Sequence, residues 1–184
     1  MSNVTIAAYV CTILSMLIMV VFNIICLKKY RLLSCYSAYG PKWAEYTKEH
    51  PQLKGLNIWS IVTIVSAGLL FVPMLTSAKD SPLEFLCFFA PLYLFLVGFT
   101  PKYQENKTQN IVHQIGAWGC VICILLWLFF IVQMWAVLIP VFVLALVIGV
   151  ATRTFIPSCT YYLEMAMYLS TYLVLLFSGC LIVP

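Results

Sequence analysis

The sequence predicts an all-α integral membrane protein, a bundle of six transmembrane helices with both termini outside. Three observations lead to this prediction. Hydrophobic residues make up 64% of the chain and charged residues only 9%, whereas soluble domains average about 25% charged residues. The hydrophobic residues form six runs that are long enough to cross a bilayer. When these runs are threaded through a membrane, nine of the ten Lys and Arg residues fall on one side.

The six runs define the predicted elements. A spanning helix needs about 20 mostly apolar residues, with a range of about 17 to 25. Inside lipid every backbone polar group must be bonded within the protein, so these runs must be helical. We treat residues 1–184 as a single transmembrane domain. Its predicted helices cover residues 4–27, 57–77, 83–99, 111–132, 135–151 and 160–182.

The boundary between the fourth and fifth helices depends on two residues. Only Gln133 and Met134 interrupt the apolar stretch from 111 to 151. This stretch is too long for one span, so we predict a tight turn near Gln133.

The connection over residues 28–56 is the only long one. In it Trp43, Tyr46 and Leu53 are interleaved with charged residues such as Lys42 and Glu49. This amphipathic pattern predicts a short helix that lies along the membrane interface.

The basic residues set the orientation. Six follow the first helix, two follow the third and one follows the fifth, while the opposite side holds only Lys79. Cytoplasmic loops carry an excess of Lys and Arg, so we predict a multi-pass protein of the bacterial inner (plasma) membrane with these loops inside. Because the basic residues are spread over several short loops, they do not form a nucleic-acid patch. The nine residues are Lys28, Lys29, Arg31, Lys42, Lys48, Lys54, Lys102, Lys107 and Arg153.

Glu164 is the strongest candidate for a functional residue. A carboxylate within a span costs about 2.5–3.5 kcal/mol at mid-helix. It could serve as a proton carrier, a metal ligand or a substrate anchor, or it could be a structural carboxylate bonded to tyrosine hydroxyls or to Arg153. It belongs to a polar stripe at three- or four-residue steps, which should face the bundle interior. The stripe consists of Tyr161, Glu164, Tyr168, Thr171 and Ser178.

His113 is the second candidate, at the start of the fourth predicted helix. It could be a metal ligand, a general base or a pH-sensitive switch, or an interfacial residue bonded to a loop carbonyl. A zinc site usually needs three or four ligands. His50, His113 and Glu164 could converge only if the long loop folds back under the bundle.

These polar residues gather at the cytoplasmic end in this topology, where we expect any pocket to lie. No metal site and no cofactor are predicted. The candidate ligand-binding residues are Glu164, His113, Tyr161, Tyr168, Arg153, Ser34 and Ser37.

Three patches of the chain carry a resemblance. The first runs from Val97 to Lys102 and on to Val112-His113, the second covers residues 162–171, and the third is the Ser- and Tyr-containing turn at residues 34–39. They resemble the corresponding parts of small bacterial six-helix membrane proteins of unknown function, and more distantly the membrane superfamily of alkaline ceramidases and progestin-receptor-like proteins. Hydrolases of that superfamily bind a metal through three His, with Ser and Asp nearby.

This chain departs from the hydrolase pattern. It has one candidate His in the bundle and no His-x-x-x-His, and Ser37 stands where an acidic residue would be expected. We therefore expect a non-enzymatic protein that binds or moves a small or lipid-like ligand. A metal-dependent lipid hydrolase, and a structural or regulatory partner of another membrane protein, remain the alternatives. The expected partners are membrane lipid and a small-molecule or lipid ligand, and not nucleic acid.

Overall fold

The computed structural model describes residues 2–50, 52, 57–78 and 80–181, and its regular structure in these ranges is entirely helical. The elements are α1 (Asn3–Tyr30), η1 (Tyr36–Ala38), α2 (Tyr39–Glu49), α3 (Ile58–Ser77), α4 (Glu84–Gly98), α5 (Lys107–Leu126), η3 (Trp127–Val132), α6 (Trp135–Ala151) and α7 (Phe155–Leu181).

The predicted helices differ from these elements mainly at their starts. The helix predicted from residue 111 begins at Lys107, because the Asn106 side chain accepts a hydrogen bond from the Gln109 N–H (3.1 Å) and caps the helix. The helix predicted from residue 160 begins at Phe155 and is kinked at Ser158, where φ is −130° and ψ is 25°. Residue 182, the predicted end of that helix, lies outside the described residues.

The turn predicted near Gln133 lies at Gln133. α5 continues into η3, a π-helical turn, and Gln133 then takes a left-handed backbone conformation with φ of 53°. A left-handed residue ends a helix because it turns the chain out of the helical path. α6 starts two residues later, at Trp135.

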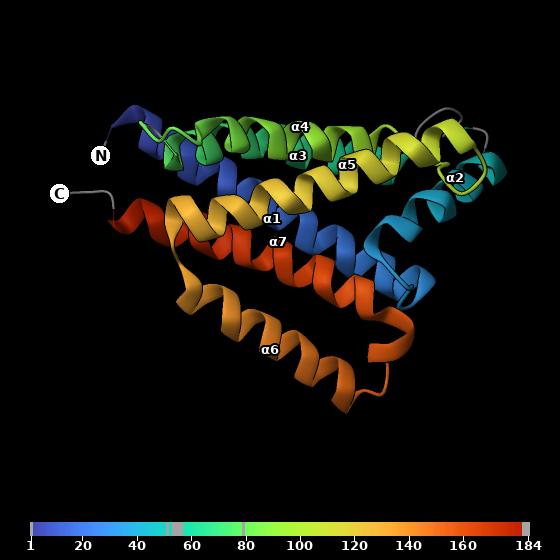
Figure 1. Cartoon of the computed structure of the whole chain (residues 1–184). Helices are drawn as coiled ribbons and strands as arrows, with labels where there is room; N and C mark the ends of the chain where they lie inside the picture. Colours follow the sequence, from blue (N-terminus) through green and yellow to red (C-terminus); the bar gives the residue numbers. More distant parts are fainter. Residues whose placement is uncertain (1, 51, 53–56, 79, 182–184) are drawn as a thin grey trace.

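Consecutive helices of the bundle run in opposite directions (Figure 1). α1 packs against α3 and α7, α4 lies between α3 and α5, and α6 packs mainly on α7. α1 begins and α7 ends at the same end of the bundle, and α2, the α4–α5 loop and the α6–α7 turn lie at the other end (Figure 1). The loops that carry the basic residues therefore share one end, apart from Lys54, which lies outside the described residues.

Much of the bundle exterior is apolar. Among the described residues, three helical stretches are long and apolar enough to cross a membrane: Asn3–Tyr30, Ile58–Ser77 and Lys107–Val132. The apolar helices Glu84–Gly98 and Ala136–Ala151 are shorter. Exposed apolar side chains cover the outer faces, as with Val143, Leu144 and Val147 of α6. A water-soluble protein rarely exposes so large an apolar surface, and this one suits a lipid surrounding.

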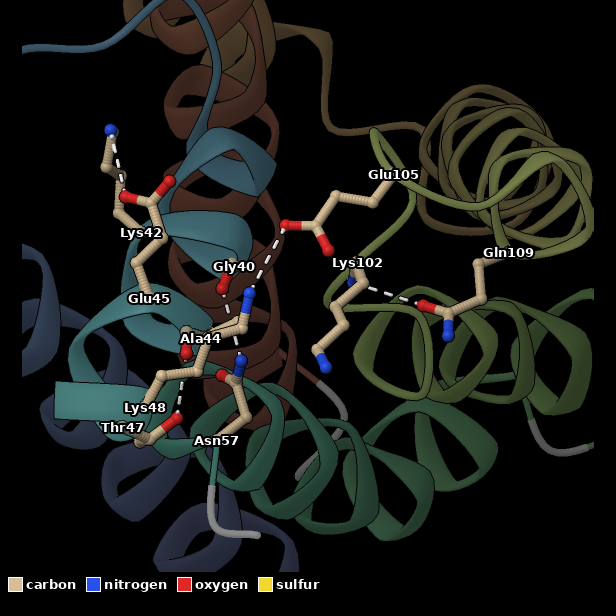
Figure 2. Close-up of polar contacts among 10 residues, drawn as sticks. All are labelled: Gly40, Lys42, Ala44, Glu45, Thr47, Lys48, Asn57, Lys102, Glu105 and Gln109. Carbon is tan, nitrogen blue, oxygen red and sulfur yellow. Dashed lines mark hydrogen bonds and ion pairs between the residues drawn. The ribbon is translucent and has the colours of Figure 1, made fainter. Parts of the chain in front are cut away.

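The helix predicted in the long connection is α2, and it packs onto the end of the bundle. Trp43 is buried and its indole N–H donates to the Cys26 sulfur of α1 at 3.3 Å. The Asn57 amide donates to the Gly40 carbonyl, and Lys48 reaches Glu105 of the α4–α5 loop at 3.9 Å (Figure 2). Leu53, predicted on the apolar face of this helix, lies outside the described residues.

α4 and α5 approach each other closely at Gly116. A Cβ atom there would lie 2.8 Å from the Tyr93 carbonyl oxygen and 3.0 Å from the Leu96 Cβ. Small residues allow such close helix contacts in membrane proteins. Gly68 of α3 differs, because a Cβ there would meet only the Phe95 ring at 3.7 Å.

We expect Gly116→Ala to lower the midpoint of thermal unfolding in detergent, at a cost of about 1–3 kcal/mol, because the added methyl group forces the α4 backbone to shift. Gly68→Ala is the matched control and should leave the midpoint unchanged or raise it, since Ala favours the helix. Equal midpoints for the two variants would contradict the close contact.

Candidate functional site

The turn after α1 is fastened to the start of α7 by two hydrogen bonds. The Tyr36 backbone N–H donates to the Glu164 carboxylate, and the Tyr161 backbone N–H donates to the Ser34 carbonyl oxygen at 3.0 Å. The kink at Ser158 explains the second bond, because it leaves the Tyr161 N–H in the first turn of a new helical segment, where intrahelical acceptors are missing. Residues 34–38 are thus fixed against α7.

His113 is held from the other side of the bundle. Its Nδ1 lies 3.1 Å from the Thr100 hydroxyl oxygen, and its ring stacks on Tyr103 with 3.9 Å between centroids and 10° between planes. The side chain is 2% exposed. Thr100 follows α4 and Tyr103 lies in the α4–α5 loop, so the end of α4 and the following loop position the imidazole.

Tyr103 also covers the loop end of the site. Its hydroxyl lies 3.9 Å from the Cys35 sulfur and accepts a hydrogen bond from the Gln104 amide. Burial raises the pKa of Tyr103 to about 12, so the phenol stays protonated at neutral pH. The contact between Cys35 and Tyr103 joins the turn after α1 to the α4–α5 loop.

Glu164 and His113 line the same cavity. It has a volume of about 410 Å³, lies between α5, α6 and α7, and also contacts the turn after α1. Its polar wall is formed by Cys35, Ser37, Tyr103, His113 and Glu164. Its apolar wall includes Val121, Leu125, Phe142 and Met167.

A second, smaller cavity of about 70 Å³ adjoins the first toward the bundle interior. Both are lined by Ser37, His113 and Glu164. Tyr168 lines the smaller one, together with Leu94 and Val97 of α4. These three polar residues therefore stand where the two spaces meet, together with the apolar residues Ala117, Val121 and Met167, which also line both.

The structure separates the predicted site residues into two groups. Ser37, His113 and Glu164 line both cavities and Tyr168 lines the smaller one. Tyr161 is buried, but its hydroxyl donates to the Asn23 side chain at 3.2 Å. Ser34 is exposed and contributes its backbone carbonyl, and Arg153 is exposed in the α6–α7 turn with φ of 57°.

Glu164 has a partner that the sequence did not indicate. One of the two interpretations of this residue was a structural carboxylate bonded to tyrosine hydroxyls or to Arg153, whereas in the described part of the chain its hydrogen bond comes from the Tyr36 backbone. The stripe does face inward: Tyr161 and Thr171 are buried and Glu164 borders the cavities. The side chain of Ser178 lies outside the described residues.

Sequence reasoning missed Cys35, Thr100 and Tyr103 as parts of the site. Asn106 could have pointed to Thr100 and Tyr103. Asn is a favoured helix N-cap, and a helix that starts after Asn106 has its first turns, with His113, beside the loop that precedes it. No local pattern marks the Cys35–Tyr103 contact, which joins residues 68 positions apart.

The zinc site implied by the distant hydrolase resemblance does not fit. Across residues 2–50, 52, 57–78 and 80–181, no group of three His, Cys, Asp or Glu side chains is placed to hold a metal ion. His50 does not line the cavity, and its Nδ1 lies 2.8 Å from the Tyr46 carbonyl oxygen on α2.

Comparisons with protein-family models, curated proteins and solved structures found no match for this chain. The site is therefore interpreted from its own geometry.

We expect Glu164→Ala to loosen the turn after α1, because the Tyr36 N–H loses its acceptor at a cost of about 1–3 kcal/mol. The measurement is the rate at which Cys35 reacts with a maleimide, followed by mass spectrometry of its peptide, and this rate should rise several-fold. Glu164→Gln keeps an acceptor oxygen and should react at nearly the wild-type rate. If Glu164→Ala reacted no faster than Glu164→Gln, the bond would not hold the turn.

Proposed function

We propose that this chain is a multi-pass protein of a bacterial inner membrane, and that the cavity between α5, α6 and α7 binds or moves a small or lipid-like ligand. In this proposal α1, α3, α4, α5, α6 and α7 cross the bilayer. The end with α2 and the basic loops lies in the cytoplasm, and both termini lie outside. The proposal extends to membership of the small six-helix family that the three sequence patches resemble.

One observation carries the ligand-binding part of the proposal. A single cavity of about 410 Å³ joins a polar wall with His113 and Glu164 to an apolar wall with Leu125 and Phe142. Ligand sites typically have volumes of about 300–1,000 Å³, apolar linings and a few converging polar groups.

A metal-dependent hydrolase is not proposed. A catalytic zinc site uses three protein ligands. The described residues bring one imidazole, one carboxylate and one thiol to the cavity, and these side chains are not grouped to hold a metal ion. A regulatory role through α2 would predict contacts to another protein at the basic end, and the cavity supplies no argument for it.

Filling the cavity tests the ligand-binding proposal. Val121→Trp places an indole in a position that lines both cavities, so a lipid-like molecule retained through purification should fall at least several-fold per protein. The bound molecule is measured by native mass spectrometry and by extraction and chromatography. Ile122→Trp is the matched control, because Ile122 is the next residue of α5 and is 52% exposed outside the cavity. Equal retention in the two variants would contradict the proposal.

The orientation has its own test. A cysteine introduced at Lys102, in the α4–α5 loop, should be protected from a membrane-impermeant thiol reagent in intact cells, because the positive-inside rule puts that loop in the cytoplasm. A cysteine at Asp80, which is exposed between α3 and α4, should be labelled from outside. Labelling at residue 102 with protection at residue 80 would show the opposite orientation. Labelling at both positions, or protection at both, would contradict the span count.

A further inference from the structure

We infer that the cavity takes a single-chain amphiphile whose headgroup donates hydrogen bonds, a hydroxyl or an ammonium group, and that this ligand enters sideways from the bilayer between α5 and α7. The inference rests on the proposed function and specifies the ligand class and the route. It comes from the hydrogen-bonding roles of the polar wall and from the exposure of the cavity rim.

His113 presents an acceptor to the cavity. The Thr100 hydroxyl lies 3.0 Å from the carbonyl oxygens of both Leu96 and Val97, and we assign its single proton to this backbone pair. With that assignment the Thr100 oxygen accepts from the Nδ1–H of His113, which lies 3.1 Å away. In a neutral imidazole with its proton on Nδ1, the other ring nitrogen, Nε2, is an acceptor.

Glu164 presents a second acceptor. One carboxylate oxygen receives the Tyr36 N–H, and the carboxylate has room for further donors. The ion pairs among the described residues are Lys42–Glu45 and Lys48–Glu105, so no Lys, Arg or His in that part of the chain pairs with Glu164. A carboxylate at membrane depth is costly without such donors, and a ligand that donates would supply one.

The Ser37 and Tyr103 hydroxyls of this wall have partners within the protein. The Ser37 hydroxyl donates to the Cys35 sulfur at 3.4 Å, and the Tyr103 hydroxyl lies 3.9 Å from the same sulfur. The inner end of the cavity is therefore a pair of acceptors without a cation. A fatty-acid carboxylate or a phosphate headgroup carries acceptor oxygens of its own and brings no cationic donor to these acceptors, so it fits them less well than a hydroxyl or an ammonium group.

The apolar wall accommodates a hydrocarbon chain. Val121 and Leu125 of α5 lie one turn apart along the cavity, with Phe142 of α6 and Met167 of α7 as the other apolar surfaces. Burial of a chain against such a surface contributes about 0.8 kcal/mol per methylene group. The headgroup and the hydrocarbon chain of the ligand would thus contact different walls of the same cavity.

The rim of the cavity is exposed on its bilayer-facing side. Four lining residues are exposed, and they come from two facing helices: Gln114 and Trp118 from α5, and Thr160 and Leu163 from α7. Trp118 is 64% exposed and Leu163 is 44% exposed.

The polarity of this rim changes with depth as the bilayer does. The polar pair Gln114 and Thr160 lies nearer the loop end than Trp118 and Leu163, which follow about one helical turn further along α5 and α7. At the loop end itself, Tyr103 stacks on His113 and meets Cys35. A ligand would thus pass from the lipid, with its headgroup beside the polar pair, rather than from water through the loop end.

A headgroup series tests the ligand class. Three photoreactive probes share one alkyl chain with a diazirine near its end, and carry a hydroxyl, a primary amine or a carboxylate headgroup. In the full-length protein in nanodiscs, the alcohol and amine probes should label peptides of α5 and α6 around Leu125 and Phe142, with saturation. The carboxylate probe should label them at least tenfold less. Equal or stronger labelling by the carboxylate probe would overturn the inference and leave the proposed function standing, whereas no saturable labelling by any probe would sink both.

A rim variant tests the route. Thr160→Trp should slow labelling by the alcohol probe at least several-fold, with an unchanged midpoint of thermal unfolding. Leu169→Trp is the control, since Leu169 is exposed on the same helix and does not line the cavity. If Thr160→Trp labelled as fast as Leu169→Trp, the sideways route between α5 and α7 would be wrong.

Discussion

The hydrogen bond from the Tyr36 N–H to the Glu164 carboxylate is the interaction on which the site depends. It joins residues 128 positions apart and fixes the turn after α1 against the last helix. Because of this bond, Cys35 and Ser37 reach the cavity wall, and Glu164 keeps acceptor capacity facing the same space. A backbone N–H and a carboxylate each need a partner in an apolar surrounding, so one bond meets two demands at once.

On the opposite wall, His113 is positioned by the start of α5 and by the loop before it. Asn106 caps α5 and sets its start, which places His113 about two turns into the helix. There the Thr100 hydroxyl, itself bonded to the backbone, fixes one ring nitrogen, and Tyr103 covers one face of the ring. The imidazole is therefore held from two sides although it lies beside a cavity.

The position of α6 creates the space between these walls. α6 packs mainly on α7, and its outer face is apolar and exposed. Phe142 of α6 nevertheless lines the cavity. The result is a space with polar groups at one wall and apolar side chains at the other, whose exposed rim is formed by residues of α5 and α7. This division of the walls is the basis on which an amphiphilic ligand is proposed.

The sequence alone determined the helical class, the approximate position of every long helix and the break at Gln133, because hydrophobicity and span length are local properties that tertiary contacts cannot reverse in lipid. It also marked Glu164 and His113, since an ionisable group in an apolar run stands out by its cost. Side-chain capping by Asn106 and the kink at Ser158 shifted two helix starts, because these depend on backbone hydrogen bonds that an apolar count does not register. Only the tertiary structure decided that Glu164 bonds the backbone of Tyr36 and not Arg153, and that Ser37, His113 and Glu164 share a cavity. Every residue except proline carries a backbone N–H, so no sequence pattern reveals which one a distant carboxylate will meet.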